Sequence, residues 1–407
     1  MSEIWLGITL LCLGIWLGLL CFRGQFWQAD QRLEAKEPEN LPDNLEIWPS
    51  VCAVVPARNE ATLVPVTLRS LLEQNYPGVF TVILVDDQST DRTASIAQET
   101  AQSLAQVARL RVLTTAPLPS GWTGKLWALE QGIQQAENLT PMPDYLLLTD
   151  ADIVHEATNL RRLVAKAQQE DLDLLSLMVL LRCESFWERF LIPAFVFFFQ
   201  KLYPFRWVNN PAHRTAAAAG GCILVQREAL HRSGSIAAVR QALIDDCALA
   251  AAIKSTGQPS QPGTQGRIWL GLTSTTHSLR PYPSLGTIWD MVARTAFTQL
   301  NYSPLLLLGT LVGMILIYEV PPLGAVGGLI SGNWSIAIAG SGAWLLMTWA
   351  YLPTIRLYGL SPLWAFSLPA IALLYNLMTF DSALRHWRGK GGAWKGRVYP
   401  VSISRQP

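Results

Sequence analysis

Residues 145–152 read YLLLTDAD, and this stretch decides the fold class. The run YLLLT (145–149), with three leucines in a row, is typical of a strand buried on both faces, as in a parallel sheet. Two carboxylates, Asp150 and Asp152, follow at once, although like charges so close together repel each other. Carboxylates at positions i and i+2 can both bind one hard divalent cation, which would neutralise that repulsion. Alternatively, Asp152 caps a helix formed by the next segment, IVHEATNLRRL.

Further strand-like runs lie on both sides of this stretch, separated by helix-like segments. The runs are VCAVV (51–55), TVILV (81–85) and RLRVL (109–113), and the helix-like patterns cover 62–73, 91–104 and 125–136. This alternation predicts an α/β fold with a mostly parallel sheet flanked by helices. Polar clusters follow three of the strands: PARNE (56–60), DDQSTD (86–91) and TDAD (149–152). Because ligands of open α/β sheets bind beyond the carboxyl ends of the strands, the three clusters predict one site.

The N-terminal end of the chain predicts a membrane anchor. Half of the 407 residues are hydrophobic, only 15% are charged, and the mean hydropathy is +0.24. Residues 4–22 carry no charge and are long enough to span a bilayer. A cleaved signal peptide is the alternative, but Glu3 stands where positive charge is expected and no small-residue cleavage site follows. Arg23, Arg32 and Lys36 place the next domain in the cytoplasm.

The C-terminal third is more apolar still. It contains no charged residue within 295–318, 320–355 or 357–380, which predicts three or four C-terminal transmembrane helices. The basic tail RHWRGKGGAWKGR (385–397) favours a cytoplasmic end, and hence four spans or one segment that does not cross. The net charge of +1 gives no field that would attract nucleic acid. Six scattered cysteines without a CxxC pair indicate reduced thiols.

Six short motifs occur in one order: VPARNE (55–60), VDDQSTDRT (85–93), GKLWAL (124–129), TDAD (149–152), GGCILVQREAL (220–230) and IDDCALA (244–250). With these motifs the sequence resembles the family 2 glycosyltransferases, which share the GT-A fold. Two further segments, WDMVARTAFTQLNYSPLLLL (289–308) and GGAWKGRVYP (391–400), carry a closer resemblance. They make the chain most similar to the membrane-bound hopene-associated glycosyltransferases of bacterial hopanoid gene clusters.

The resemblance implies a nucleoside-diphosphate sugar as donor, with UDP as the family default. It places five residues around the nucleoside: Pro56, Arg58, Glu60, Asp86 and Asp87. Carboxylates suit this role because they accept hydrogen bonds from ribose hydroxyls and base N–H groups. A turn with a helix cap at Asp91 is the structural alternative for the Asp86–Asp87 pair, and the two can coexist.

The predicted cofactor is a divalent cation, Mn²⁺ or Mg²⁺, held by Asp150 and Asp152. Acting as a Lewis acid, it would stabilise the charge that develops on the leaving diphosphate. Lys125 would approach the same phosphates as a point charge. An ordinary solvated lysine is the alternative.

An inverting transfer also needs a general base to take the proton of the acceptor hydroxyl. In the family, the second residue of an acidic pair does this. The pair here is Asp245–Asp246 instead of the commoner Glu-Asp, so we predict Asp246 as the base with Asp245 supporting it. Both acids would also suit the N-terminus of a helix over CALAAAIK. Gly220 and Gly221 fit either a close backbone approach to the sugar or acceptor, or a plain turn.

The acceptor is predicted to be a membrane lipid, a hopanoid by resemblance. A helix expected over 285–300 has an apolar face suited to lying on a bilayer, and its Arg294 would reach donor phosphates or an acceptor headgroup. The alternative is that helix and tail only anchor the protein. We expect a multi-pass protein of the bacterial inner membrane with a cytoplasmic catalytic domain. Its expected parts are an anchor (1–22), a linker (23–49), a GT-A catalytic domain (50–280), an interfacial helix (281–302), a transmembrane region (303–381) and a basic cytoplasmic tail (382–407).

Two other functions compete with this prediction. A processive polysaccharide synthase would combine the same kind of domain with membrane helices, but such enzymes carry a Q-x-x-R-W motif before the C-terminal spans. The corresponding segment, MVART (291–295), keeps the arginine without the glutamine or tryptophan, which favours transfer of a single sugar. The second alternative is a non-catalytic membrane scaffold with a degenerate fold. Every acidic position expected for the chemistry is present, which argues against a scaffold.

Overall fold

The computed structural model describes residues 2–35, 47–257, 265–389, 393–394 and 397–398. They form two compact units. The sheet unit consists of residues 30–182 and 205–280, and the helical unit of residues 1–29, 183–204 and 281–407. The continuous domain expected over 50–280 is therefore interrupted by residues 183–204, which belong to the helical unit.

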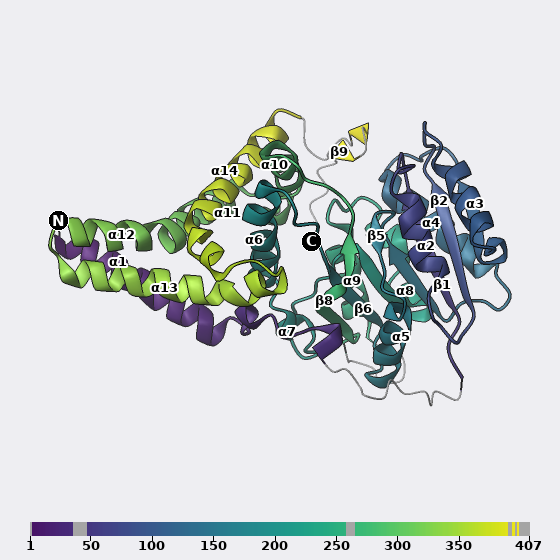
Figure 1. Ribbon diagram of the computed structural model, residues 1–407, viewed down its shortest axis with the longest axis horizontal. Coiled ribbons are helices and arrows are strands. Elements are labelled where there is room, and N and C mark those ends of the chain that lie inside the picture. Colours follow the sequence, from purple (N-terminus) through teal and green to yellow (C-terminus); the bar gives the residue numbers. More distant parts are fainter. Residues whose placement is uncertain (1, 36–46, 258–264, 390–392, 395–396, 399–407) are drawn as a thin grey trace. The chain divides into compact units, whose positions relative to one another are not determined.

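The sheet unit contains one eight-stranded sheet with the order β3-β2-β1-β4-β7-β6-β8-β5 (Figure 1). Neighbours pair in parallel except that β7 is antiparallel to both β4 and β6, and β5 is antiparallel to β8. The prediction of a mostly parallel sheet flanked by helices is confirmed. The strands are β1 (Val51–Ala57), β2 (Phe80–Asp86), β3 (Leu110–Thr114), β4 (Tyr145–Thr149), β5 (Ile153–Val154), β6 (Leu174–Leu180), β7 (Cys222–Gln226) and β8 (Ile268–Ser278).

Strand β1 is longer than expected, because it continues through Pro56 to Ala57. Pro56 lies opposite Val85 of β2, whereas pairing with β4 has already ended at Val54. On the β4 side, the missing N–H of the proline therefore interrupts no ladder, which is how a strand tolerates this residue.

Helices cover both faces of the sheet. Side chains of β1 at positions 51, 53 and 55 join one hydrophobic core with Leu68 and Leu163 from the helices α2 and α5. On the other face α4 lies so close that a Cβ on its Gly132 would come within 2.4 Å of Val54, so this helix needs glycine at that point. The helices of the unit are α2 (Val64–Leu72), α3 (Thr93–Ser103), α4 (Gly124–Glu137), α5 (Asn159–Gln169), α7 (Phe205–Val208), α8 (Arg227–Arg232) and α9 (Asp245–Thr256), with short 3₁₀ turns η2 (Leu33–Ala35), η3 (Val107–Arg109) and η4 (Ile236–Val239).

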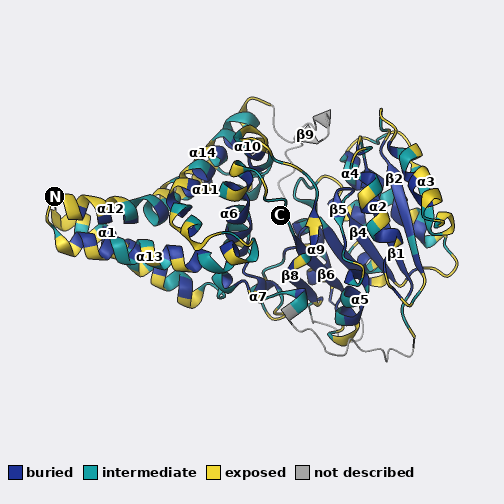
Figure 2. Cartoon of the chain, viewed as in Figure 1, coloured by how far each residue is buried: buried dark blue, intermediate teal, exposed yellow. Residues whose placement is uncertain are grey.

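Among the residues that the structure describes, the helical unit contains four helical stretches that are long and apolar enough to cross a membrane: Ser2–Phe22, Pro304–Ile330, Trp334–Leu357 and Pro362–Trp387. Three of them follow the sheet unit, within the predicted three to four. Many large apolar residues along these stretches are exposed, as expected of helices that cross a membrane. Figure 2 marks exposed residues in yellow. The elements are α1 (Ser2–Phe22), η1 (Phe26–Gln28), α6 (Phe186–Leu202), α10 (Leu285–Ala293), η5 (Thr298–Leu300), α11 (Pro304–Met314), the π-helical η6 (Ile315–Glu319), α12 (Val320–Ile330), α13 (Trp334–Leu357), η7 (Pro362–Ser367) and α14 (Leu368–Trp387), followed by a ribbon of β9 (Ala393–Trp394) and β10 (Arg397–Val398).

Helix α6 was not expected from the sequence, although its start has a recognisable signal. Ser185 accepts a hydrogen bond from the backbone N–H of Glu188, and the Glu188 carboxylate accepts from the N–H of Ser185, which together form a capping box. The Glu188 side chain is fully buried and also accepts from the N–H of Tyr282 at 2.7 Å. The start of α6 is thereby tied to the segment that leads into α10.

The expected helix over 285–300 was wrong in length, because α10 ends at Ala293. Beyond it the chain turns to bury Phe297 against α14, where the Phe297 N–H donates to Ser382 Oγ at 3.0 Å.

Candidate active site

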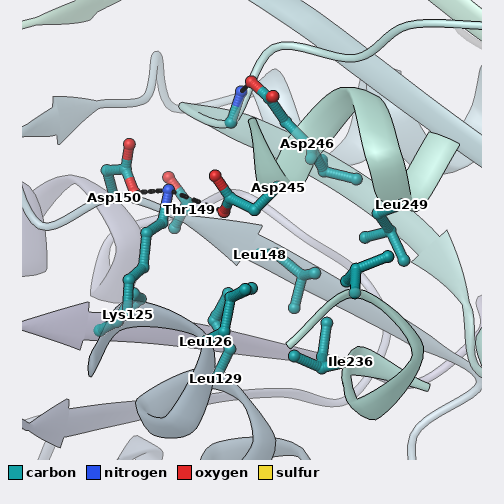
Figure 3. Close-up of a pocket in the computed structure, with 14 residues that line it drawn as sticks. Lys125, Leu126, Leu129, Leu148, Thr149, Asp150, Ile236, Asp245, Asp246 and Leu249 are labelled. Atoms are coloured by element: carbon teal, nitrogen blue, oxygen red, sulfur yellow. Dashed lines mark hydrogen bonds and ion pairs between the residues drawn. The ribbon is translucent and has the colours of Figure 1, made fainter. Parts of the chain in front are cut away.

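A pocket opens where strand β4 ends, between α4, β7 and α9 (Figure 3). Four of its lining side chains are charged, and they come from three separate segments. Apolar side chains form most of the rest of the wall. The charged residues are Lys125, Asp150, Asp245 and Asp246, and the apolar ones include Leu126, Leu129, Leu148, Ile223, Ile236, Val239 and Leu249. The sheet thus brings together residues that are far apart in sequence at its carboxyl edge.

Lys125 lies at the centre of this acidic cluster. It occupies the first turn of α4, whose N-cap Thr123 accepts a hydrogen bond from Leu126 N–H. Its Nζ lies 3.0 Å from Asp150 Oδ1 and 3.5 Å from Asp245 Oδ2, as the dashed lines of Figure 3 show. Burial disfavours the ammonium, but Asp150 and Asp245 outweigh it and hold the pKa of Lys125 above its usual value. The alternative of an ordinary solvated lysine is therefore excluded.

Asp246 is held by two backbone donors. Its Oδ2 accepts from Gly220 N–H at 2.8 Å and its Oδ1 from Cys247 N–H at 2.8 Å. Burial, and then the neighbouring Asp245, raise the pKa of Asp246 to about 6, although Lys125 and both N–H groups act in the opposite direction. Such a carboxylate is ionised at neutral pH and still basic enough to take a proton. Both acids also lie in the first turn of α9, as the helix-terminus alternative expects, and this position is compatible with the predicted catalytic role.

The two glycines have different surroundings. A Cβ on Gly220 would lie 3.3 Å from Lys125 Nζ and 3.4 Å from Asp246 Oδ2, inside the charged cluster. A Cβ on Gly221 would instead lie 3.1 Å from the Val179 side chain. The close packing of Val179 therefore favours glycine at this position. Only Gly220 belongs to the pocket wall.

Asp152 lies in a second ionic cluster that the sequence did not reveal. Its Oδ2 accepts from Arg280 Nε at 3.0 Å and from Ser278 Oγ at 3.1 Å, and Arg280 also pairs with Glu60. Burial and the charge of Asp150 raise the pKa of Asp152, which Arg280 partly offsets. Asp152 caps no helix, because β5 follows it and α5 begins only at Asn159; the capping alternative was wrong. Arg280 follows the end of β8 by two residues, and β8 was not among the strands predicted from the sequence.

Asp150 and Asp152 fit a divalent cation in part. Mg²⁺ is usually held by one or two carboxylates and takes its other ligands from substrate phosphates and water. Asp150 meets this requirement, since its side chain is 36% exposed and lines the pocket. Asp152 would have to share its carboxylate with Arg280. In the part of the chain that the structure describes, no three His, Cys, Asp or Glu side chains group as a metal site, so the remaining ligands would come from the substrate.

The remaining predicted residues gather at the ends of β1 and β2. Arg58 donates to the Asp87 backbone carbonyl at 2.6 Å and lies 3.5 Å from its Oδ2, and the Asp87 carboxylate also accepts from Thr115. Asp86 is buried, accepts from Ser89 N–H, and keeps one carboxylate oxygen without a hydrogen-bond partner. Pro56 reaches the pocket wall itself. Asp91 accepts from Thr93 N–H at 3.0 Å, as expected of a residue preceding α3.

Arg294 is the one predicted binding residue outside the sheet unit. It follows the last residue of α10 in the helical unit and its side chain is exposed. Its role therefore remains a prediction from sequence.

Several known proteins are similar to this chain in sequence. Residues 52–234 match the sequence model of glycosyl transferase family 2. A beta-monoglucosyldiacylglycerol synthase of Synechocystis sp. is 33% identical over 33% of this chain and 27% of its own length. A 4,4'-diaponeurosporenoate glycosyltransferase of Staphylococcus haemolyticus is 32% identical over 26% of this chain and 25% of its own length. The chain thus spans about a quarter of the length of these curated relatives.

One solved structure resembles nearly the whole chain. The mannosyltransferase PcManGT of Pyrobaculum calidifontis, in complex with GDP-Man and Mn²⁺, covers 95% of this chain and 98% of its own with a TM-score of 0.52 at 17% identity. At this identity the likeness speaks for the fold alone. Residues 52–234 are thus similar in sequence to glycosyl transferase family 2, and the mostly parallel sheet flanked by helices has the GT-A type of architecture.

Proposed function

We propose that this protein is an inverting, membrane-bound glycosyltransferase that moves a single sugar from a nucleoside-diphosphate sugar to the hydroxyl group of a membrane lipid. The observation that carries the proposal is the cluster of Lys125, Asp150, Asp245 and Asp246 around one pocket at the carboxyl edge of the sheet. A cation beside three carboxylates suits a reaction in which a diphosphate leaves and a hydroxyl loses its proton.

The residues divide the chemistry between them. Asp246 takes the proton of the acceptor hydroxyl, and the N–H groups of Gly220 and Cys247 keep its carboxylate in one orientation. Lys125 places a positive charge at the donor phosphates while holding Asp150 and Asp245 in place. A divalent cation, Mn²⁺ or Mg²⁺, would be held by Asp150 and Asp152 and would stabilise the leaving diphosphate as a Lewis acid. The buried acids at the ends of β1 and β2 accept hydrogen bonds from the nucleoside, which we take to be uridine.

A lipid acceptor is favoured because apolar helices precede and follow the sheet unit in the chain. A transferase for soluble acceptors has no need of membrane segments on both sides of its catalytic domain. Curated relatives of the domain include lipid glycosyltransferases, which supports the same conclusion. Within this class we propose a polycyclic lipid alcohol of the hopanoid type, on the resemblance carried by residues 289–308 and 391–400.

We further propose that only three stretches cross the bilayer: α1, the stretch from α11 through α12, and α13. Trp27, just beyond α1, packs 4.2 Å from Trp349 in the second half of α13, so the C-terminal end of α1 and this half of α13 lie at one level. Helix α14 is tied, at its middle and near its end, to elements that adjoin the sheet unit in sequence. Tyr375 donates to the Leu191 carbonyl of α6 at 2.9 Å, and Arg385 pairs with Asp290 of α10 at 2.7 Å.

This topology agrees with the positions of the positively charged segments along the chain. If Pro362–Trp387 lies at the cytoplasmic face without crossing, the basic tail after it ends on the same side as the sheet unit. Positively charged segments next to membrane helices prefer the cytoplasmic side, and Arg23 and Arg32 already place the sheet unit there.

Comparative lipid mass spectrometry tests the proposal in cells. Bacteria expressing the wild-type chain should contain a lipid heavier by one sugar than its precursor, whereas cells with Asp246→Asn should contain only the precursor. A product carrying a ladder of many sugars would favour the processive synthase instead. Identical lipids in wild-type and Asp246→Asn cells would overturn the proposed function.

A further inference from the structure

Three buried polar side chains connect the end of β4 with the turn before β7. Asn159 Nδ2 lies 2.9 Å from His155 Nδ1, His155 Nε2 lies 2.9 Å from Thr149 Oγ1, and Thr149 Oγ1 lies 2.8 Å from the carbonyl oxygen of Gly221. The exposed fractions of Asn159, His155 and Thr149 are 0%, 4% and 2%. The chain of contacts therefore lies inside the protein, away from bulk water.

The contacts fix the direction of every hydrogen bond. A carbonyl oxygen can only accept, so the single hydroxyl proton of Thr149 is donated to Gly221. Thr149 Oγ1 must then accept from His155, which places the imidazole proton on Nε2 and leaves Nδ1 to accept from the Asn159 amide. Burial, and then the nearby His277, lower the pKa of His155 to about 3, so the ring is neutral. We call this sequence of bonds, from Asn159 to Gly221, the histidine relay.

The relay adjoins the proposed catalytic cluster at two of its members, Thr149 and Gly221. Thr149 immediately precedes Asp150, which pairs with Lys125. Gly221 immediately follows Gly220, whose N–H binds Asp246 and whose missing side chain leaves room for Lys125. The backbone pairing of Thr149 with Cys222 already brings the two segments side by side, and the relay adds a side-chain bond at the open end of that ladder.

We propose that His155 is a positioning residue for the transfer reaction: through Thr149 it holds the Gly220–Gly221 turn, and with it the Asp246 carboxylate, at a fixed distance from Asp150. The inference rests on the proposed function. Carboxylates that serve the leaving group and the acceptor must keep their separation, because a misplacement of about 1 Å can slow an enzyme about a hundredfold. A hydrogen-bonded chain has only one geometry, whereas apolar side chains of the same volume would pack in several.

Two substitutions of Thr149 test the relay, one that removes its hydroxyl group and one that keeps it. Thr149→Val keeps the shape but removes the hydroxyl, whereas Thr149→Ser keeps the hydroxyl. We expect Thr149→Val to lower kcat about tenfold to a hundredfold while the KM for the donor changes less than about twofold. Thr149→Ser should retain most of the wild-type kcat. In the same way His155→Gln, which can still donate from a terminal nitrogen, should be more active than His155→Leu.

A matched control separates positioning from stability. Thr100 is a buried threonine of α3 whose hydroxyl also donates to a backbone carbonyl, that of Ile96, at 2.7 Å. Thr100→Val should lower the unfolding temperature about as much as Thr149→Val does, with no change in kcat. A Thr149→Val enzyme with wild-type kcat would overturn the proposal, and so would a Thr149→Ser enzyme as impaired as Thr149→Val.

A second measurement does not depend on activity. With ¹⁵N-labelled histidine, the chain contains five labelled rings, and His155→Gln assigns the signal of interest. We expect His155 to appear at neutral pH as the tautomer protonated on Nε2, and its Nε2–H signal to shift in Thr149→Val. A ring protonated on Nδ1 would refute the relay. If the wild-type protein transfers no sugar, the proposed function fails, while the tautomer still decides whether the relay exists.

Discussion

Replacing the proposed base gives the sharpest prediction about the chemistry. Asp246→Asn keeps the size of the side chain but removes its ability to take a proton, so turnover should fall at least about a hundredfold. The amide has a single oxygen, which can accept a hydrogen bond from the N–H of Gly220 or from that of Cys247. The variant therefore loses one of the two hydrogen bonds of 2.8 Å. Donor binding by titration calorimetry should change little, and thermal unfolding should show only the loss of that one hydrogen bond, so both are measured beside turnover.

The raised pKa of Asp246 also predicts how strongly the turnover of the wild-type enzyme should depend on pH. The pKa of Asp246 is raised to about 6, and the base acts only when ionised, so activity should rise with pH through that value. Turnover at about pH 5 should then be about one tenth of that at pH 7, because about a tenth of the carboxylates are ionised there. A carboxylate with an ordinary pKa would be almost fully ionised at both pH values and would give a flat profile.

Asp245→Asn distinguishes the two acids. Asp245 raises the pKa of Asp246, so its removal should move the rise in activity to lower pH while turnover persists. The reasoning would be refuted by a flat profile between about pH 5 and pH 7 in the wild type. It would equally be refuted if Asp245→Asn were inactive and Asp246→Asn active, since the base would then be the neighbouring residue.

The other predictions concern the cation, the lysine and the topology. Asp150→Ala and Asp152→Ala should each abolish turnover while the protein still inserts and folds, and EDTA should inhibit the wild type; full activity of either variant in EDTA would exclude the metal. Lys125→Met should weaken donor binding about tenfold or more, the usual loss for a hydrogen bond between charged groups, and Lys125→Arg should restore part of it in a nucleotide titration. A C-terminal green fluorescent protein fusion should fluoresce and an alkaline phosphatase fusion should be inactive; the reverse pattern would mean that Pro362–Trp387 crosses the bilayer.

The sequence predicted those parts of the fold that depend on local patterns. Strand β4 has the expected bounds, Tyr145–Thr149, and β2 extends only one residue beyond each end of the expected run. Helix α4 extends one residue beyond its expected ends as well. These elements combine a clear hydrophobic period with polar residues at their ends, which is the information that a sequence displays most directly.

The sequence did not reveal partners that only the folded chain brings together. Arg280 contacts Asp152 and Glu60, which lie 128 and 220 residues before it, and no local pattern links them. The histidine relay could not be predicted for the same reason, because Gly221 lies 72 residues after Thr149 and no local pattern links them. Helix α6 was not predicted. Its apolar residues come shortly after the apolar strand β6, so the sequence does not distinguish them from further residues of the sheet unit's core.

The central claim is that a sugar passes to a lipid, and one in vitro measurement tests it most directly. Purified protein would be given labelled UDP- or GDP-sugars with Mn²⁺ or Mg²⁺ and two kinds of acceptor: polycyclic or long-chain lipid alcohols embedded in vesicles, and soluble sugars or peptides. Asp246→Asn serves as the control. We predict label in the organic-solvent extract with the wild-type protein and none with the variant. Efficient labelling of the soluble acceptors, with no labelled lipid, would contradict the account.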